Sequence, residues 1–403
     1  MDRRTNPFAP GAGLQPPELA GRDELIENAR IDMERVIAGR QTKSMMLLGL
    51  RGVGKTVLLN RLLKIANELG FQTIKIEAPE GGTLPDLIVP ELRRILYNLD
   101  LMASLGHKAR RARAVLQNFA AIFKASLGDV DFGIEPAPGL ADTGNLEQDL
   151  PSLLIAVAEA AQEKGTAIAL FIDEVQYLSP IELASIIVAC HEIAQRGLPL
   201  LFVGAGLPQI AALAGNAKSY AERLFNYPKV DRLDDEAAAR ALIKPAESEG
   251  VSFADSAIID IIHRTEGYPY FIQEWGSHVW NTADATPITA DHVAQATQAV
   301  VTHLDENFFR VRFDRLTALQ QKYLRAMAEL GPGPHKTGDI ATMLSAEPSA
   351  VATVRQQLIK KGMVWSQRHG ETAFTVPMFD AYMRRQMPVL EKHLPRRRPT
   401  SSS

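Results

Sequence analysis

The sequence has a single cysteine, Cys190, among its 403 residues, so a framework of internal disulfides is excluded. Such sparing use of cysteine is typical of a reducing compartment. Because Cys190 stands in an apolar stretch, residues 186–194, we expect a buried small side chain rather than a reactive thiol. No apolar run approaches the roughly 18 residues that cross a bilayer, and the N-terminus lacks the apolar core of a signal peptide. We therefore expect a cytoplasmic protein without a membrane partner.

Metal-ligand spacing and a strong net charge are also missing. The nine histidines show no zinc-like spacing with cysteine or carboxylates, so we expect no structural zinc. The net charge of −3 is small but unevenly divided. From Leu316 to the end there are thirteen basic and six acidic side chains, a net +7, which leaves −10 for the residues before. This asymmetry indicates a polyanionic partner for the C-terminal part.

The first half of the chain has the pattern of an α/β nucleotide-binding core. Residues 1–20 are rich in proline and glycine and predict an extended N-terminal arm. In residues 21–233, short apolar strands alternate with amphipathic helices, which predicts a parallel sheet with helices on both faces. The expected strands are residues 44–50, 73–76, 168–172 and 200–203, with a last one near 229–233. Residues 129–139 alternate like a small surface hairpin.

The second half is predicted to be helical until a ribbon near its end. Residues 234–315 have helical periodicity and predict a helical lid. Residues 316–390 predict three helices (317–330, 338–344 and 349–361) and then two strands around a turn, which is the order of a winged helix. The basic tail, residues 391–403, is expected to be disordered.

A phosphate-binding loop is the strongest motif. Residues 49–56, Gly-Leu-Arg-Gly-Val-Gly-Lys-Thr, fit G-x-x-x-x-G-K-[ST] between a predicted strand and a predicted helix. Glycines let backbone amides surround phosphate oxygens, and the helix N-terminus adds positive potential. We expect Lys55 to reach the β and γ phosphates of ATP and Thr56 to bind Mg²⁺. The predicted nucleotide-binding residues here are Gly49, Arg51, Gly52, Val53, Gly54, Lys55, Thr56 and Val57.

A pair of carboxylates follows the strand predicted at residues 168–172. Asp173 and Glu174 should therefore lie at the carboxyl edge of the sheet, where nucleotides bind in such folds. Asp173 is expected to hold Mg²⁺ together with Thr56, and Glu174 to orient and deprotonate the attacking water. The two motifs together predict an ATPase.

With Gly21-Arg22-Asp23-Glu24 and Gln176, these motifs resemble the AAA+ superfamily, in particular the origin-recognition and archaeal initiator ATPases and the neighbouring STAND signalling ATPases. The resemblance covers about residues 17–390. It implies a three-layer P-loop core, a helical lid and a C-terminal winged-helix domain, and it implies that Arg22 contacts the adenine. In the family, the strand corresponding to residues 200–206 ends in a polar sensor of the γ-phosphate. Here that end is glycine and alanine, so slow hydrolysis is expected.

The resemblance also suggests two further sites. Residues 219–225 match the stretch in which such ATPases place an arginine finger, so Arg223 is expected to act on a neighbouring subunit's nucleotide, or else to be a surface ion pair. Gly267-Tyr268-Pro269 resembles the Gly-x-Pro of STAND and initiator lids, which implies that Pro269 lies against the nucleotide. A helix-breaking turn is the alternative. No arginine follows at the position that many such lids use.

Two hypotheses for the function remain open. In the first, ATP with Mg²⁺ drives assembly or binding of double-stranded DNA, and the winged helix reads DNA. Its expected DNA contacts are Arg355, Gln356, Lys360 and Lys361 on the third helix and Arg368 in the wing. In the second, the chain is a STAND-type signalling or defence scaffold that holds ATP or ADP, and the winged helix binds protein. Either a homo-oligomer or a partner protein fits the sequence.

Overall fold

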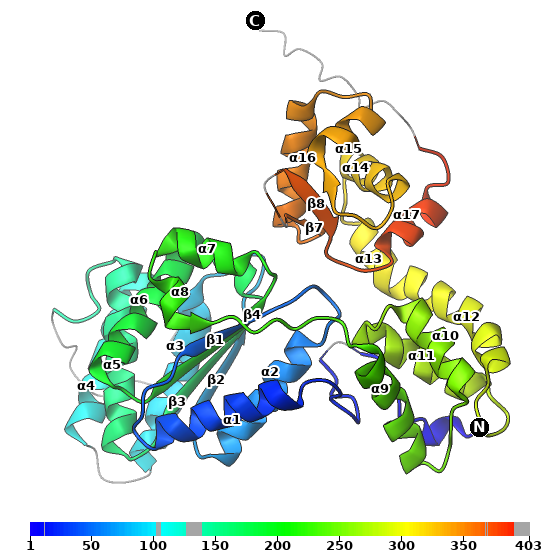
Figure 1. Ribbon diagram of the computed structural model, residues 1–403. Coiled ribbons are helices and arrows are strands. Elements are labelled where there is room, and N and C mark those ends of the chain that lie inside the picture. Colours follow the sequence, from blue (N-terminus) through cyan, green and yellow to red (C-terminus); the bar gives the residue numbers. More distant parts are fainter. Residues whose placement is uncertain (12, 102–105, 126–138, 367, 369, 391–403) are drawn as a thin grey trace, which may run out of the picture.

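The computed structural model describes residues 1–11, 13–101, 106–125, 139–366, 368 and 370–390 (Figure 1). The hairpin expected at residues 129–139, apart from Gly139, and the tail 391–403 lie outside these residues. Among the described residues, no helix combines the length and the apolarity needed to span a membrane.

A five-stranded parallel sheet in the order β2-β3-β4-β1-β5 forms the centre of the first half. Its strands are β1 (Ser44–Leu48), β2 (Gln72–Glu77), β3 (Ile168–Asp173), β4 (Leu200–Gly206) and β5 (Phe225–Asn226). The fifth strand was expected at 229–233, and this prediction is wrong: Lys229 makes only an isolated bridge to Leu48. The physical reason is Pro228, which has no N–H to donate and interrupts the ladder beside β1.

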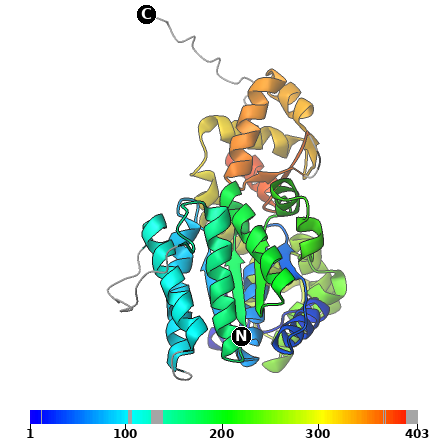
Figure 2. The same cartoon turned by 90° about the vertical axis from the view of Figure 1, so that its left-hand side faces the viewer.

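Helices cover both faces of the sheet, as predicted (Figures 1 and 2). Helices α1 (Asp23–Ile37) and α2 (Lys55–Glu68) pack on one face, against strand residues such as Met45 and Leu47. Helices α3 (Leu84–Leu101), α5 (Leu146–Glu163) and α6 (Pro180–Arg196) pack on the other, against Met46 and Leu48, and α4 (His107–Phe123) packs on α3 and α5. The alternation along β1 therefore divides the apolar core into two layers, giving the expected three-layer α/β fold.

Four helices, here called the helical unit, follow the sheet: α9 (Asp235–Ser248), α10 (Asp255–Thr265), α11 (Pro269–Thr282) and α12 (Ala290–Leu304). Trp275 and Trp280 are each 1% exposed within it, so both are packing residues. Helix α12 continues through a π-helical turn, η3 (Asp305–Phe309), into α13 (Arg310–Phe313). A π turn changes which side chains face inward, and such turns are frequent at functional sites.

The N-terminal arm is docked against the helical unit. Among its described residues, the one helical element is a short 3₁₀ turn, η1 (Arg3–Thr5). Phe8 is 5% exposed and packs edge-on against Phe253 and Trp280. Nδ2 of Asn6 donates to the carbonyl of Ser277 at 3.0 Å, and the amide of Ala9 donates to Gln273 Oε1 at 3.1 Å. These contacts fix the path of the residues that follow.

The last elements form a C-terminal unit: α14 (Ala318–Glu329), β6 (His335–Lys336), α15 (Thr337–Met343), α16 (Pro348–Lys360), β7 (Val364–Trp365), β8 (Glu371–Phe374) and α17 (Phe379–Gln386). The three helices and the β7–β8 ribbon occur in the order that the sequence predicts for a winged helix. Strand β6, which extends the sheet to β6-β8-β7, and helix α17 were not predicted. Phe379, Tyr382 and Met383 make the buried face of α17.

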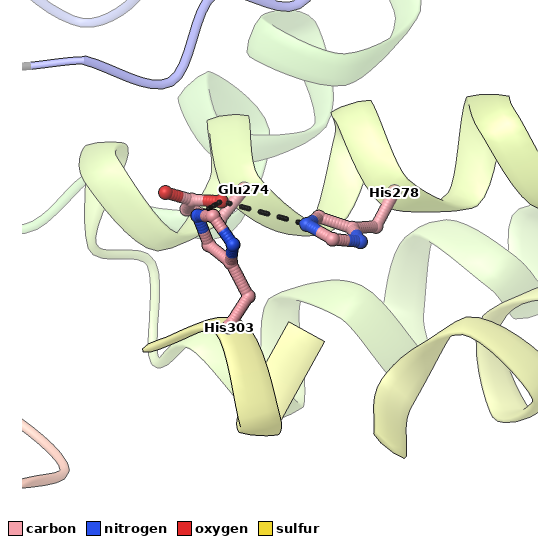
Figure 3. A group of neighbouring side chains, drawn as sticks. All are labelled: Glu274, His278 and His303. Atoms are coloured by element: carbon pink, nitrogen blue, oxygen red, sulfur yellow. Dashed lines mark ion pairs between the residues drawn. The ribbon is translucent and has the colours of Figure 1, made fainter. Parts of the chain in front are cut away.

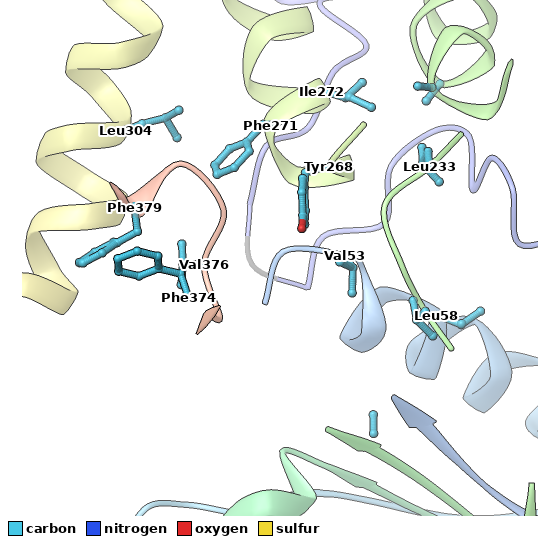
Figure 4. Close-up of a cluster of buried hydrophobic side chains, with 14 of the residues drawn as sticks. Val53, Leu58, Leu233, Tyr268, Phe271, Ile272, Leu304, Phe374, Val376 and Phe379 are labelled. Atoms are coloured by element: carbon cyan, nitrogen blue, oxygen red, sulfur yellow. The ribbon is translucent and has the colours of Figure 1, made fainter. Parts of the chain in front are cut away.

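One apolar cluster connects all three parts of the chain. It contains Val53 beside the glycine loop, Phe271 in α11, and Phe374 and Phe379 in the C-terminal unit (Figure 4). The glycine loop therefore lies where the sheet, the helical unit and the C-terminal unit meet.

Candidate functional site

The loop between β1 and α2 has the backbone that its glycines predict. Gly52 and Gly54 have φ of 82° and 90°, in the left-handed region that favours glycine. A Cβ at Gly49 would lie 2.1 Å from the carbonyl oxygen of Val230, so this position has room for glycine alone. Helix α2 begins directly after the loop, at Lys55. The loop thus ends on a helix N-terminus, where free amides and the helix dipole favour an anion.

Lys55 is buried at this helix start. It is 7% exposed, and its Nζ donates to the carbonyl of Leu50 at 2.7 Å. Burial lowers the pKa of Lys55 to about 8, although the charges of Glu174 and Asp173 act in the opposite direction. The ammonium is therefore incompletely compensated by its present neighbours, and a bound anion would stabilise it.

Thr56 and the two carboxylates meet at the carboxyl end of β3. Oγ1 of Thr56 donates to Oδ2 of Asp173 at 2.7 Å, and the amide of Glu174 donates to Oδ1 of Asp173 at 2.9 Å. Asp173 is 2% exposed. Glu174 has φ of 53°, a costly conformation for a residue with a side chain, which directs the chain sharply away from the sheet. Hydroxyl and carboxylate oxygens together are the donor set that hard divalent cations prefer.

Gln176 lies between Glu174 and the end of β4. Its Nε2 donates to Oε2 of Glu174, and its Oε1 accepts from the amide of Leu207 at 3.1 Å. A Cβ at Gly206 would lie 2.5 Å from Gln176 Oε1 and 2.2 Å from Cδ1 of Ile210. The glycine that replaces a polar residue at the end of β4 therefore leaves room for the amide that holds Glu174.

A cavity of about 450 Å³ lies over the loop, within the size range of ligand pockets. It brings together most of the predicted nucleotide-binding and catalytic residues: Arg22, Arg51, Gly52, Val53, Gly54, Lys55, Thr56, Val57, Glu174 and Pro269. Gly49 shapes the loop from beneath and does not line the cavity. The N-terminal arm contributes Ala9, Gly11 and Leu14 among others, which was not predicted.

Arg22 links the loop to the segment after β5. Its Nη2 donates to the carbonyl of Val53 at 3.3 Å and to the carbonyl of Asp231. Burial lowers the pKa of Arg22, against the charges of Asp231 and Asp234. Arg22 thus borders the cavity while holding two backbone segments together.

Arg312 is a cavity residue that sequence reasoning missed. It lies on α13, and its guanidinium is 4.0 Å from the ring centre of Phe308, which stacks on Tyr270 at 4.8 Å. Burial lowers the pKa of Arg312 to about 10, and the neighbouring charge of Arg51 acts in the same direction. Nε of Arg312 and Nε of Arg51 are both buried without a hydrogen-bond partner. Two arginines with unsatisfied donors thus lie beside the loop, an arrangement that favours a polyanion.

Arg51 also connects the loop to the C-terminal unit. Its amide donates to the carbonyl of Thr375, after β8, at 3.2 Å, and its Nη2 donates to the hydroxyl of Tyr177 at 2.7 Å. Tyr177 belongs to the short turn η2 (Val175–Tyr177) that follows the acidic pair. A Cβ at Gly362 would lie 2.7 Å from Arg51 Nη2, so the glycine admits the arginine. The C-terminal unit is thereby seated on the phosphate-binding loop.

Arg223 and the residues predicted to contact DNA lie elsewhere. Arg223, in α8 (Ala221–Leu224), is exposed and does not line the cavity. Gln356, Lys360 and Arg368 are exposed on the C-terminal unit.

Arg355 and Lys361, by contrast, are engaged inside the C-terminal unit. Arg355 donates to Thr372 Oγ1 at 2.7 Å and to Ser366 Oγ at 2.6 Å, which ties α16 to the β7–β8 ribbon. Nζ of Lys361 donates to Gln320 Oε1 at 2.9 Å. Neither side chain projects freely from α16, as the sequence interpretation had it, because the ribbon and α14 supply closer acceptors.

Comparisons with known families agree with this geometry. Residues 18–203 match the family model described as AAA ATPase domain, and residues 306–383 match the one described as Domain of unknown function (DUF8462). A comparison with curated proteins found no match. The expected resemblance to AAA+ P-loop ATPases is confirmed.

Similar solved structures align with almost the whole chain. The Walker-type ATPase paby2304 of Pyrococcus abyssi is 16% identical, with a TM-score of 0.58 over 92% of this chain and 97% of that one. The Aeropyrum pernix ORC1 protein in complex with DNA is 14% identical, with a TM-score of 0.47 over 93% and 94%. The Thermotoga maritima RuvB Holliday junction branch migration motor is 17% identical, with a TM-score of 0.46 over 90% and 96%. At 16% identity, the likeness to paby2304 concerns the fold alone.

Proposed function

We propose that the chain is an ATP-dependent switch, which binds ATP with Mg²⁺ over the loop at residues 49–56, hydrolyses it slowly and passes the nucleotide state to the C-terminal unit. The observation that supports this most is the shared cavity: the loop lines it together with Arg312, which lies on the helix leading to the C-terminal unit. The unsatisfied Nε atoms of Arg51 and Arg312 support a polyphosphate as the ligand, because phosphate oxygens accept charge-assisted hydrogen bonds.

Each residue of the loop and of the acidic pair has a role in this proposal. Lys55 and the amides of the loop bind the β and γ phosphates. Thr56 and Asp173 are the residues that would hold Mg²⁺, which would neutralise charge on the phosphates when bound. Glu174, held by Gln176, orients the attacking water and accepts its proton. Hydrolysis is slow because the end of β4 offers glycine and alanine where a hydroxyl or amide would help to position the water.

The coupling between nucleotide and C-terminal unit uses two contacts. Arg312 binds the γ-phosphate while ATP is present and loses that partner after hydrolysis. The Arg51 amide donates a hydrogen bond to the carbonyl of Thr375, which follows β8. Movement of the loop on binding phosphate would therefore displace β8. Strand β8 belongs to the C-terminal unit and α13 directly precedes it. A change at the phosphates therefore alters the position of this unit on the loop.

Double-stranded DNA is the partner that we propose for the C-terminal unit, with the unit acting as a winged helix. The exposed Gln356 and Lys360 on α16 and Arg368 in the wing supply its contacts, supported by the net positive charge after Leu316. Arg223, exposed on α8, acts on a neighbouring subunit's nucleotide if the chain assembles.

A signalling scaffold whose C-terminal unit binds protein is the second candidate. The bond between Arg51 and Thr375 favours it, because a C-terminal unit seated on the loop has the form of a closed switch. The internal use of Arg355 and Lys361 also leaves fewer basic groups for DNA.

Two assays test the proposal. Phosphate release from ATP is measured for the parent, Lys55→Ala and Glu174→Gln, and a Glu174→Gln protein that still hydrolyses ATP at the parent rate contradicts the role of the base. A gel shift with a short duplex at low and high salt is then compared with that of a Gln356→Ala, Lys360→Ala, Arg368→Ala variant. A salt-sensitive shift that this variant loses supports DNA. Absence of any shift at low salt rejects DNA and supports the scaffold.

A further inference from the structure

Three possible metal ligands converge between α11 and α12 of the helical unit (Figure 3). Glu274 and His278 are four residues apart on α11 and therefore share one face of that helix, and His303 approaches from α12. Nε2 of His278 and Nε2 of His303 each lie 3.9 Å from Oε2 of Glu274. One ligand atom from each residue lies within 4.8 Å of the other two.

The carboxylate at the centre of this cluster is incompletely satisfied. Glu274 is 2% exposed, and its Oε1 accepts a hydrogen bond from the hydroxyl of Tyr270 at 2.7 Å. Oε2 is buried and has no hydrogen-bond partner, since 3.9 Å is too long for a hydrogen bond to either imidazole. A buried carboxylate oxygen without a partner is costly. The gap between Oε2 and the two ring nitrogens is therefore a place where a cation would stabilise the unit.

We propose that Glu274, His278 and His303 bind a divalent transition-metal ion of the zinc type. Two imidazole nitrogens and one carboxylate oxygen are a donor set that suits Zn²⁺ and its late first-row neighbours, whereas Mg²⁺ prefers oxygen alone. Bonds of about 2.0 to 2.1 Å in a tetrahedral site put neighbouring ligand atoms about 3.3 Å apart. Each ring nitrogen thus needs to move by about 0.6 Å toward Oε2, and the two nitrogens, now within 4.8 Å of one another, must also close to about 3.3 Å.

The surroundings allow this movement and orient the ligands. The side chains of His278 and His303 are 28% and 46% exposed, so both rings can turn without disturbing the core. Nδ1 of His303 lies 3.2 Å from Nδ2 of Asn307. Binding of the ion by Nε2 puts the ring proton on Nδ1, so the Asn307 amide must turn its oxygen toward Nδ1 to accept from it. The Tyr270 hydroxyl orients the carboxylate from the opposite side. Three protein ligands leave one coordination position for water or a further ligand.

The ion would join two helices next to the nucleotide cavity. Tyr270 and Asn307, which contact the ligands, both line that cavity. The site is nevertheless separate from the Mg²⁺ expected at Thr56 and Asp173, and it does not depend on ATP binding.

The test is a Zn²⁺ titration of tag-free, full-length protein in competition with a chromophoric chelator, without nucleotide. We expect one Zn²⁺ per chain, a higher melting temperature with Zn²⁺, and an affinity at least about tenfold lower in His303→Ala and in His278→Ala. His263→Ala, which removes an exposed histidine of α10, is the matched control and keeps the parent affinity.

Co²⁺ provides an independent readout, because nitrogen and oxygen ligands in a tetrahedral site give visible absorption that octahedral Co²⁺ in water largely lacks. The proposal is overturned if the parent binds no Zn²⁺, or if the His278→Ala, His303→Ala double variant binds it as tightly as the parent. Circular dichroism verifies folding, and both substitutions are at partly exposed positions. The same titration is made with Lys55→Ala, which lacks the side chain proposed to bind the phosphates. Because the metal site does not use Lys55, Zn²⁺ binding in this variant tests the metal site separately from the proposed ATPase.

Discussion

The hydroxyl of Thr56 donates a hydrogen bond of 2.7 Å to Oδ2 of Asp173, although the two residues are 117 positions apart in the sequence. The bond joins the first turn of α2 to the end of β3. Because Asp173 is 2% exposed, the pair is protected from bulk water, and the two oxygens form a preorganised place for a hard cation.

Asp173→Asn should weaken the use of Mg²⁺ without removing nucleotide binding. An amide oxygen still accepts from Thr56, but the negative charge that attracts the ion is gone. We expect the Mg²⁺ concentration for half-maximal ATPase activity to rise by an order of magnitude or more, on the order of 1.4 kcal/mol. Asp235→Asn, at an exposed position of α9, is the control. An unchanged Mg²⁺ dependence in Asp173→Asn would show that the ion is held elsewhere.

Lys55→Ala should abolish tight nucleotide binding while sparing the nucleotide-free fold. Burial lowers the pKa of Lys55 to about 8, so its charge adds little to the stability of the empty protein and is available for phosphate. Titration with a fluorescent ATP analogue should show a loss on the order of 100-fold, about 2.8 kcal/mol. Lys64→Ala, exposed on the same helix, should bind like the parent. Parent-like binding in Lys55→Ala would contradict the assignment of the loop.

Gln176→Leu should slow hydrolysis and leave ATP binding intact. The substitution removes the bonds to Glu174 and to the Leu207 amide while keeping a similar volume. Since a general base acts only when it is oriented, we expect kcat to fall on the order of 10- to 100-fold. KM for ATP should stay within about twofold, because the phosphate contacts are unaffected. If KM rises while kcat is unchanged, Gln176 contributes to binding rather than to the position of the base.

Phe8→Ala should release the N-terminal arm from the helical unit. Phe8 fills the space over Gly276, where a Cβ would lie 2.6 Å from its ring, and loss of a buried phenyl costs about 3 kcal/mol or more. The bonds at Arg3 and Arg4 should become faster trypsin sites, and nucleotide affinity should fall because arm residues line the cavity. Ile31→Ala, at a 45% exposed site, is the control. Unchanged proteolysis would mean that Phe8 does not hold the arm.

The loop and the acidic pair were predictable because each consists of consecutive residues that form a recognisable motif. The loop motif has four positions of fixed type in eight residues, and Gly52 and Gly54 adopt φ values that glycine favours. The strands β1 to β4 were likewise predictable from short apolar runs, and α6 from its Ser179 cap and the glycine at its end. The position of β5 depended on Pro228 and on pairing with β1, which local pattern does not reveal.

Residues brought in by tertiary packing were beyond the sequence. Arg312 reaches the cavity because a π turn precedes it and because α13 packs beside the loop. Glu274 and His303 are brought together by the packing of α11 on α12, so no motif spacing marks them. Arg355 was predicted to contact DNA bases from α16. Only the fold of the β7–β8 ribbon shows that it donates to acceptors within the C-terminal unit instead.

The most direct test of the central claim compares the affinities for ADP and for a non-hydrolysable ATP analogue in the parent, Arg312→Ala and the control Arg310→Ala, whose side chain is 63% exposed. We predict that Arg310→Ala binds each of the two nucleotides with the affinity of the parent. Arg312→Ala should lose about tenfold, roughly 1.4 kcal/mol, for the ATP analogue and less than about twofold for ADP. The role of Arg312 at the γ-phosphate would be contradicted if Arg312→Ala lost affinity equally for both nucleotides or for neither. A parent that binds neither nucleotide would contradict it as well.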